Sequence, residues 1–436
     1  MRPIFRVMFR ALRYRNFRLF FMGQSISLIG TWMQFIAMSW LVYRLTGSAF
    51  MLGVVGFSSQ IPSFLLSPVA GVLVDRWDRH KILIYTQAFA MLQALTLAVL
   101  TLTGTVAVWH IIVLGVFLGC VNSFDAPARQ SFIIDMVEKK EMLGNAIALN
   151  SLMFNGARLI GPSIAGMLIA VTGEGICFLT NGLSFLAVLV SLFLMNIKKQ
   201  SMEHKTSNIL HGLKEGTSYT FGFAPIRHIL MLLGTISLMG MSYTVLMPVF
   251  AKDILHGGPS TLGFLMASAG VGAIIATVFL ASQKNTLRFG NIIPISSAIF
   301  SLGIIAFSLS RVLWLSLFFM ALTGFGFMTH MAACNTFLQT IVDDDKRGRV
   351  MSYYAMSFLG MAPIGSILAG SLATWMGPTN ALITGGIVCL AASLVFAAKV
   401  PELKKMVHPI YVKMGVIPEV VAGINAASRL AVPPED

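Results

Sequence analysis

The sequence predicts an all-α polytopic membrane protein with twelve transmembrane helices in two six-helix halves. Of its 436 residues, 56% are hydrophobic and only 11% are charged, whereas soluble domains carry about 25% charged residues. Charge-free runs recur along the chain, the longest at 350–398, and a spanning helix needs only about 20 predominantly apolar residues. One long polar connection, around 196–228, separates six such segments from six more.

The predicted spans follow the hydrophobic stretches in order. No series of short segments with alternating hydrophobicity, which a transmembrane barrel requires, interrupts them. The twelve spans are expected at 18–42, 49–74, 82–104, 108–133, 145–171, 175–197, 228–251, 259–282, 290–309, 312–340, 350–375 and 378–398.

The positive charges indicate the orientation of the spans. The chain carries 31 Lys and Arg against 17 Asp and Glu, a formal net charge of +14. With both termini in the cytoplasm, only Arg44, Lys252 and Arg311 fall outside, and only Arg129 and Arg158 lie within spans. Because cytoplasmic loops of membrane proteins are enriched in Lys and Arg, we predict that both termini are cytoplasmic. The basic charge then reflects topology, so membrane lipid and not nucleic acid is the expected partner.

These assignments divide the chain into five parts. The N-terminal segment is basic and amphipathic, and residues 3–16 are read either as an interfacial helix or as a basic tail that only sets the orientation. The beginning of the C-terminal tail is too polar to span, so we expect the tail to lie on the membrane surface or to stay unfolded. The parts are the interfacial segment 1–17, the N-terminal half 18–197, a cytoplasmic linker 198–227, the C-terminal half 228–399 and a cytoplasmic tail 400–436.

Motifs of enzymes and metal sites are missing from the sequence. The four cysteines all fall inside predicted spans, without a CxxC or Cys/His spacing. A phosphate-binding G-x-x-x-x-G-K-[ST] loop, HExxH, a nucleophile elbow and paired catalytic carboxylates are all absent. We therefore expect no enzyme activity, no metal and no cofactor.

Weak internal similarity indicates that the two halves arose by duplication. The stretch "GPSIAGMLIAVTG" at 161–173 is similar to "GSILAGSLATWMG" at 365–377. At the corresponding offset, three glycines of the fifth span match three of the eleventh, and two six-helix halves with a central site are a known transporter layout. The matched pairs are Gly144 with Gly348, Gly166 with Gly370, and Gly173 with Gly377.

The loop between the second and third spans reads "GVLVDRWDRHKIL", residues 71–83. A carboxylate at a helix end can bond nearby arginines and the positive end of a neighbouring helix, and such a cluster would latch the cytoplasmic side. The loop resembles the signature loop of the major facilitator superfamily, except that Asp78 stands where the second glycine is usual. The residues that fit it, and that we expect to form a gating loop, are Gly71, Leu73, Asp75, Arg76, Arg79 and Lys81.

A second resemblance covers nearly the whole chain. The stretches "RNFRLFFMGQSISLIGTWMQ" (15–34), "NGARLIGPSIAG" (155–166), "LKEGTSYT" (213–220) and "LQTIVDDDKRGRVMSYYAMSFLGMAPIGSILAG" (338–370) are similar to the enterobactin-exporter-like and macrolide-efflux-like branch of that superfamily. The resemblance implies proton-driven export of a small organic molecule, a siderophore or a drug-like compound, by alternating access. It also implies a multi-pass protein of the bacterial inner membrane, and we expect a monomer.

Two alternatives stay open. One is a lipid or lysophospholipid flippase of the same fold, which a lateral opening and an amphipathic site would favour. The other is a membrane receptor or scaffold of this fold that transports nothing, which a proton-dependent flux would exclude.

The fifth span also carries a run of small residues, which resembles the fifth-span motif of superfamily antiporters. Small residues let helices approach closely, and a proline permits a local bend. We expect a hinge or a tight seam between the halves, although ordinary close packing explains the run as well. The residues are Gly156, Gly161, Pro162 and Gly166.

Ionisable residues within spans are few, and each is a functional candidate. Asp125 and Arg129 lie one helical turn apart in the fourth span, and Arg158 lies in the fifth. We expect a buried pair of Asp125 with Arg158 or with Arg129, whose carboxylate either carries the proton or only fixes the helix packing. His330 is the second proton-coupling candidate, and His110 is a weaker one.

The first, fourth, seventh and tenth spans are expected to line the substrate pocket, because the resemblance implies it. Aromatic faces with a few placed polar groups are the usual lining of such pockets. The candidates are Gln24, Trp32, Gln34, Tyr243, Asn335, Tyr354 and Phe358.

Overall fold

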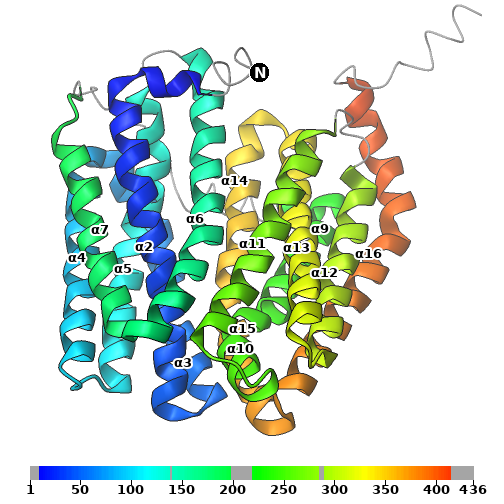
Figure 1. Ribbon diagram of the computed structural model, residues 1–436. Helices are drawn as coiled ribbons and strands as arrows, with labels where there is room; N and C mark the ends of the chain where they lie inside the picture. Colours follow the sequence, from blue (N-terminus) through cyan, green and yellow to red (C-terminus); the bar gives the residue numbers. More distant parts are fainter. Residues whose placement is uncertain (1–8, 138–139, 198–218, 284–288, 414–436) are drawn as a thin grey trace, which may run out of the picture.

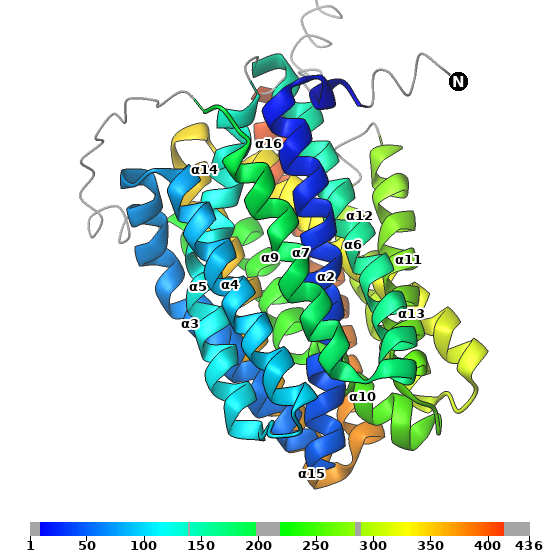
Figure 2. The same cartoon turned by 60° about the vertical axis from the view of Figure 1, so that its left-hand side comes forward.

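A computed structural model describes residues 9–137, 140–197, 219–283 and 289–413. Twelve helical segments among these residues are long and apolar enough to cross a membrane, as the sequence predicts. Six of them form the N-terminal half and run side by side through it (Figures 1 and 2). They are α2 (Arg15–Thr46), α3 (Ala49–Arg76), α4 (Arg79–Leu102), α5 (Val108–Met136), α6 (Leu143–Thr172) and α7 (Glu174–Phe193).

The C-terminal half holds four unbroken spans and two that are interrupted by π-helical turns. The unbroken spans are α11 (Pro259–Ala281), α12 (Phe289–Leu309), α13 (Leu313–Ile341) and α16 (Pro378–Lys413). The seventh span consists of α9 (Ala224–Thr235), η3 (Ile236–Gly240), α10 (Ser242–Val249) and η4 (Phe250–Ile254). The eleventh consists of α14 (Asp344–Ala355), η6 (Met356–Gly360) and α15 (Met361–Met376).

The two ends of the described chain lie at the same end of the bundle, called here the termini side (Figure 1). Residues 10–13 form a single 3-10 turn before α2, and residues 15 and 16 already belong to α2, so the described part of the expected interfacial segment is not one helix. Residues 3–8 of that segment lie outside the described residues. Most of the expected linker and the tail from 414 onward also lie outside them.

The last helix is longer than the sequence predicts. It continues through Pro401 and Pro409 to Lys413, although we expected the span to end at 398 and the tail to leave the bundle. Leu403, Val407 and Tyr411 follow one another at four-residue spacing and are buried against the C-terminal half. This apolar stripe holds the first part of the tail in a helix.

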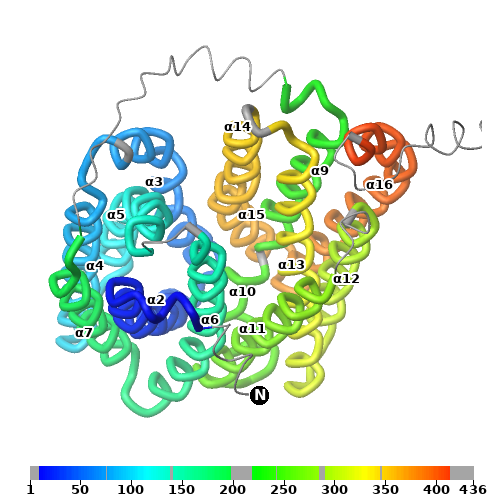
Figure 3. Tube along the Cα trace, turned by 90° about the horizontal axis from the view of Figure 1, so that it is seen from above, coloured from blue at the N-terminus to red at the C-terminus, as the bar shows by residue number. Residues whose placement is uncertain are grey.

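The two halves share a hydrophobic core only on the side opposite the termini. One cluster of buried residues joins the far end of α2, including Leu41, to C-terminal residues such as Leu246 and Phe250. A separate cluster near the termini, which includes Phe17 and Phe132, holds N-terminal residues alone. Seen from the termini side, the halves stand as two groups of helices (Figure 3). The structure is therefore closed on the opposite side and divided on the termini side.

Two glycine contacts join the halves where they meet. A Cβ atom added to Gly166 would lie 3.0 Å from the Cα atom of Gly263, so α6 and α11 touch backbone to backbone. A Cβ atom added to Gly370 would lie 3.2 Å from the Cα atom of Gly53, which joins α15 to α3 in the same way. Gly166 and Gly370 are a matched pair of the internal repeat, so each half contributes the equivalent glycine to a contact with the other half.

The other repeat glycines also behave alike. Gly173 and Gly377 end α6 and α15 with φ of 82° and 85°, a conformation that glycine adopts most readily. Gly144 and Gly348 both have open space beside them.

The expected fifth-span motif does not act as one unit. Gly166 makes the contact between the halves, and the carbonyl oxygen of Pro162 faces Gly263 beside it. Gly161 packs inside the N-terminal half against Trp32, whereas Gly156 has nothing within 4 Å. Close packing therefore explains three of the four residues and does not explain Gly156.

Replacing Gly166 with alanine should destabilise the protein, because the new methyl group would lie 2.8 Å from the carbonyl oxygen of Pro259. Overpacking of this kind costs about 1–3 kcal/mol. Gly156→Ala on the same helix is the matched control. It meets no neighbour and should be neutral or stabilising by up to about 1 kcal/mol, because alanine favours helix. Thermal unfolding of the purified variants tests this, and equal destabilisation by both would contradict the seam.

Candidate functional site

Asp125 lies inside the N-terminal half with all its contacts in that half. Its Oδ1 atom accepts hydrogen bonds from Thr86 Oγ1 at 3.0 Å and from Gln87 Nε2 at 2.7 Å, both on α4. Its Oδ2 atom lies 3.1 Å from Arg129 Nη2, one turn further along α5. The carboxylate is 5% exposed, so the ion pair and both hydrogen bonds are largely withdrawn from solvent. Of the two pairings left open by the sequence, the structure has Asp125 with Arg129.

Arg158 lies instead between the two halves. Its guanidinium carbon is 5.7 Å from the ring centroid of Trp32 on α2 and 6.0 Å from that of Phe327 on α13. No carboxylate among the described residues is within ion-pair distance of it. Of the two expected pairings, Asp125 with Arg158 is therefore not formed in this structure, because Asp125 bonds to α4 and Arg129 while Arg158 faces the opposite half.

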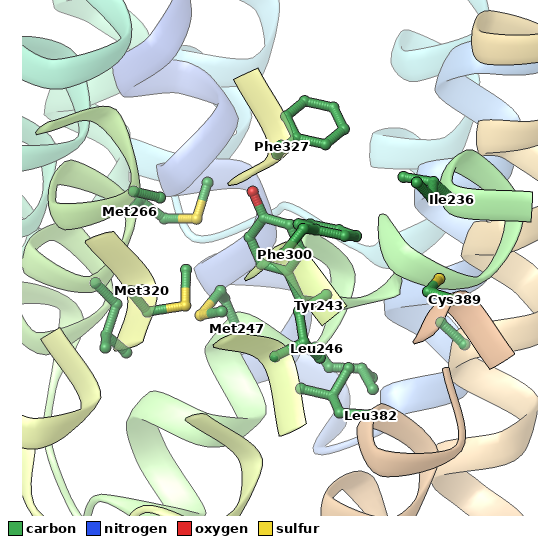
Figure 4. Packing of buried hydrophobic residues seen from close by; sticks show 14 of the residues in the cluster. Ile236, Tyr243, Leu246, Met247, Met266, Phe300, Met320, Phe327, Leu382 and Cys389 are labelled. Carbon is green, nitrogen blue, oxygen red and sulfur yellow. The ribbon is translucent and has the colours of Figure 1, made fainter. Parts of the chain in front are cut away.

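Tyr243 completes this group from the seventh span. It is fully buried, and the proton of its hydroxyl has no acceptor among the described residues. The hydroxyl points toward Phe327 (Figure 4), and Arg158 is the charged side chain beside it. We call Trp32, Arg158, Tyr243 and Phe327 the central group.

The π-helical turns bring further side chains to the central group. Phe358 in η6 lies 6.0 Å from Phe327, measured between ring centroids. Ser237 in η3 donates a hydrogen bond to the carbonyl oxygen of Phe358, so the two turns hold each other. Because a π-helical turn shifts the side chains that follow it, such turns are frequent at functional sites.

Two predicted pocket residues lie nearer the termini than the central group. The Tyr354 hydroxyl donates to the carbonyl oxygen of Met331 at 3.1 Å. The Asn335 side chain, two helical turns beyond Phe327 on α13, accepts a hydrogen bond from Gln339. Both residues are partly exposed, as a lining toward the divided side requires.

The two predicted glutamines of the first span are buried. Gln34 donates to Gln93 Oε1 at 2.9 Å and accepts from Asn181 Nδ2 at 2.8 Å, so it joins α2, α4 and α7 within the N-terminal half. Its assignment to the pocket lacks support, because this network uses its amide in the core. Gln24 is 3% exposed and makes no hydrogen bond within the described part of the chain.

The two histidine candidates make their contacts with residues outside the central group. His330 is fully buried in the C-terminal half, where Nδ1 is 3.4 Å from the carbonyl oxygen of Ile293 and Nε2 is 3.6 Å from Cys334 Sγ. The Nδ1 atom of His110 accepts a hydrogen bond from the backbone N–H of Ala107 at 3.0 Å, where α5 begins. Neither ring contacts Asp125.

The signature loop is built from contacts within the N-terminal half. Asp78 caps α4, accepting hydrogen bonds from the backbone N–H groups of His80 at 3.0 Å and Lys81 at 3.3 Å. The residue that departs from the usual glycine thus supports the next helix. Arg79 Nη1 lies 3.5 Å from Asp135 Oδ2 on α5.

Among the described side chains, none of the remaining signature residues contacts the C-terminal half to form a latch. Gly71 has open space beside it, and Arg76 is exposed at the end of α3. The side chain of Asp75 lies outside the described part of the chain. The latch between the halves stays a prediction.

A polar contact that the sequence analysis missed closes the opposite side. The Tyr43 hydroxyl on α2 donates to the Asp253 carboxylate in η4, and Lys252 Nζ lies 5.5 Å from the Tyr43 ring centroid. Nearby, Arg44 Nε is 2.7 Å from Glu174 Oε1, which ties α2 to α7. The sequence could have indicated this contact, because Tyr43 and Asp253 lie at the same end of their predicted spans.

The fold and the central group define the class of protein. Two repeated six-helix halves that meet around a shared central group are the architecture of a major facilitator superfamily transporter. Known structures agree on the fold. The POT family transporter PepTSo matches with a TM-score of 0.70 at 13% identity, covering 90% of this chain and 99% of that one. An inward-facing, occupied bacterial homologue of the human lysosomal transporter Spinster matches with a TM-score of 0.67 at 13% identity, covering 92% and 98%.

The chain belongs to the transmembrane secretion effector family of this superfamily, whose model matches residues 7–415. It is 28% identical to the staphyloferrin A transporter of Staphylococcus aureus, over 86% of this chain and 94% of that protein. It is 23% identical to macrolide efflux protein A of Streptococcus pyogenes, over 90% of this chain and 99% of that protein. It is also 23% identical to the multidrug efflux pump Tap of Mycolicibacterium fortuitum, over 86% and 93%. The chain is thus a bacterial-type, multi-pass membrane transporter and not an enzyme, and the inner membrane is its location.

Double-mutant cycles should separate the two pairings of Asp125. The cycle of Asp125→Asn with Arg129→Gln should show a coupling of about 1 kcal/mol or more, because these side chains touch. The cycle of Asp125→Asn with Arg158→Gln should show a coupling near zero. Thermal or denaturant unfolding of the purified variants measures both, and a larger coupling for Arg158 would contradict the assigned pair.

Proposed function

We propose that this chain exports a small organic molecule by alternating access, coupled to proton movement, and that it acts as a monomer. The observation that carries the proposal is the position of the central group between the halves. Its members come from both repeats, and the halves are joined on one side of it and divided on the other. A substrate bound there would have access from one side only.

Movement of one half against the other would expose the central group to the other side. Transporters of this layout work largely by rigid-body rocking of their repeats around a central site. The glycine contacts and the Tyr43–Asp253 hydrogen bond are the links that such a motion must break. The signature loop, on the termini side, is then free to close. The distribution of Lys and Arg supports a cytoplasmic termini side.

Asp125 is the best-supported proton carrier of the described residues. Protonation would remove the charge that holds Arg129 and would weaken the bonds from Thr86 and Gln87, thereby loosening α5 from α4. Ionisable groups buried in a membrane are costly and are commonly functional. The alternative is a permanently ionised pair that only fixes the packing of α4 and α5.

The relatives favour a siderophore or a drug-like compound as substrate. One is named for transport of staphyloferrin A, and two are named for efflux of macrolides or of several drugs. Their names also favour outward transport.

Everted membrane vesicles containing the chain test the proposal. When energised by respiration, they should accumulate staphyloferrin A or a macrolide, and a protonophore should abolish the accumulation. Failure to accumulate either compound, or accumulation that the protonophore leaves unchanged, would contradict proton-coupled export. A substrate flux would also exclude the non-transporting receptor.

The Asp125→Asn variant decides the role of the carboxylate in the same vesicles. It keeps a side chain of the same shape, so the chain should reach the membrane in normal amount. We expect proton-driven accumulation to fall at least tenfold, while exchange of labelled for unlabelled substrate persists. Unchanged proton-driven accumulation would show that the pair is structural.

A further inference from the structure

Arg158 of the central group has no anionic partner among the described residues, which bears on the substrate class of the proposed function. Arg158 carries a positive charge at the contact between the halves, and its neighbours are aromatic rings that accept no ordinary hydrogen bond. Four carboxylates within the described spans are engaged elsewhere. Asp125 is bound by Arg129, Asp135 by Arg79, Glu174 by Arg44, and Asp253 by Tyr43.

The buried hydroxyl of Tyr243 is a second, independent indication of a ligand. It is fully buried beside the Arg158 guanidinium, which can only donate, so the hydroxyl proton has no acceptor in the described part of the chain. A buried hydroxyl proton without an acceptor is destabilising, and native proteins rarely keep one without a reason. An acceptor that reached Arg158 would also be within reach of this hydroxyl.

The walls around this charge are aromatic. Trp32 meets Phe154 edge to face at 6.0 Å between centroids, and Phe327 meets Phe358 at 6.0 Å. Phe154 is 44% exposed, so part of this aromatic surface is uncovered. Aromatic surface of this kind packs against apolar or planar groups.

We propose that the central group binds the carboxylate of an organic anion, with Arg158 and Tyr243 donating hydrogen bonds to its two oxygens and the aromatic rings covering its apolar body. A guanidinium matches a carboxylate in charge and in the planar arrangement of its donors. The same fixed charge repels cationic amphiphiles. This assignment rests on the proposed function, because it takes the central group to be the transport site.

Binding to the purified full-length chain in lipid nanodiscs tests the assignment. The probes are 1-naphthoate, its neutral counterpart 1-naphthamide, and the cation tetraphenylphosphonium, with empty nanodiscs as the background. We expect 1-naphthoate to bind at least tenfold more tightly than either of the others. Equal or tighter binding of the amide or the cation, or no specific binding of 1-naphthoate, would overturn the assignment.

Variants locate this preference in the central group. Arg158→Gln should abolish the preference for 1-naphthoate over 1-naphthamide, Arg158→Lys should retain part of it, and Tyr243→Phe should weaken 1-naphthoate binding about threefold or more. Arg311→Gln is the matched control, because Arg311 bonds only to neighbouring loop and helix-end oxygens, and it should keep the full preference. If Arg158→Gln does not fold, the assignment is still tested by 1-naphthoate binding to Tyr243→Phe and by the comparison of the three probes on the wild-type chain. A preference that persists in Arg158→Gln would overturn the assignment.

The outcomes for function and for substrate class are separable. Loss of protonophore-sensitive export would contradict the proposed function and would leave the anion preference standing. Loss of the anion preference would leave the transport result unaffected.

Discussion

The two halves of this transporter approach each other through glycine, and the rest of the architecture depends on that contact. Within a membrane, lipid tails solvate apolar side chains, so helices associate through close packing and polar contacts. The contacts of Gly166 with Gly263 and of Gly370 with Gly53 supply such packing, and the repeat contributes one equivalent glycine from each half. The contacts hold the halves together on one side of the bundle, and they leave the central group between them.

The placement of charge follows from the same arrangement. Asp125 and Arg129 are satisfied within one half, so their pairing can survive a motion of the halves. Tyr43 and Asp253 belong to different halves, so their hydrogen bond can exist only while the opposite side is closed. Arg158 lies where the halves meet and has aromatic rather than acidic neighbours. A change of conformation would therefore leave the Asp125–Arg129 pair intact, break the Tyr43–Asp253 hydrogen bond and change the surroundings of Arg158.

Most of the fold could be predicted from the sequence, because spans, loops and repeats are recorded in local composition. The apolar lengths located the twelve spans, and the small-residue run of the fifth span included Gly166, which touches the other half in the structure. The end of α16 was missed because Pro401 and nearby charges outweighed an apolar stripe that has meaning only against its neighbours. The π-helical turns were missed because sequences such as that around Ser237 read as ordinary helix.

The site was harder to predict, because spacing along a helix gives height in the membrane but not direction around the axis. Height alone made Arg158 a plausible partner for Asp125, although the two face different neighbours. The orientation of Gln34 could not be predicted for the same reason, since its face of α2 is turned to Gln93 and Asn181. Trp32 and Tyr243 were predicted as pocket residues because their spans come from the two repeats, and the structure places both beside Arg158, which the sequence had assigned to proton coupling.

The central claim is that the central group has access to one side of the membrane at a time. Pulsed electron paramagnetic resonance on a cysteine-free background can test it, with one spin-label pair at Ser67 and Ser352 on the termini side and another at Thr103 and Asn380 on the opposite side. On acidification and addition of 1-naphthoate, the account predicts that the first distance shortens while the second lengthens. Two distances that stay fixed, or that change in the same direction, would contradict it.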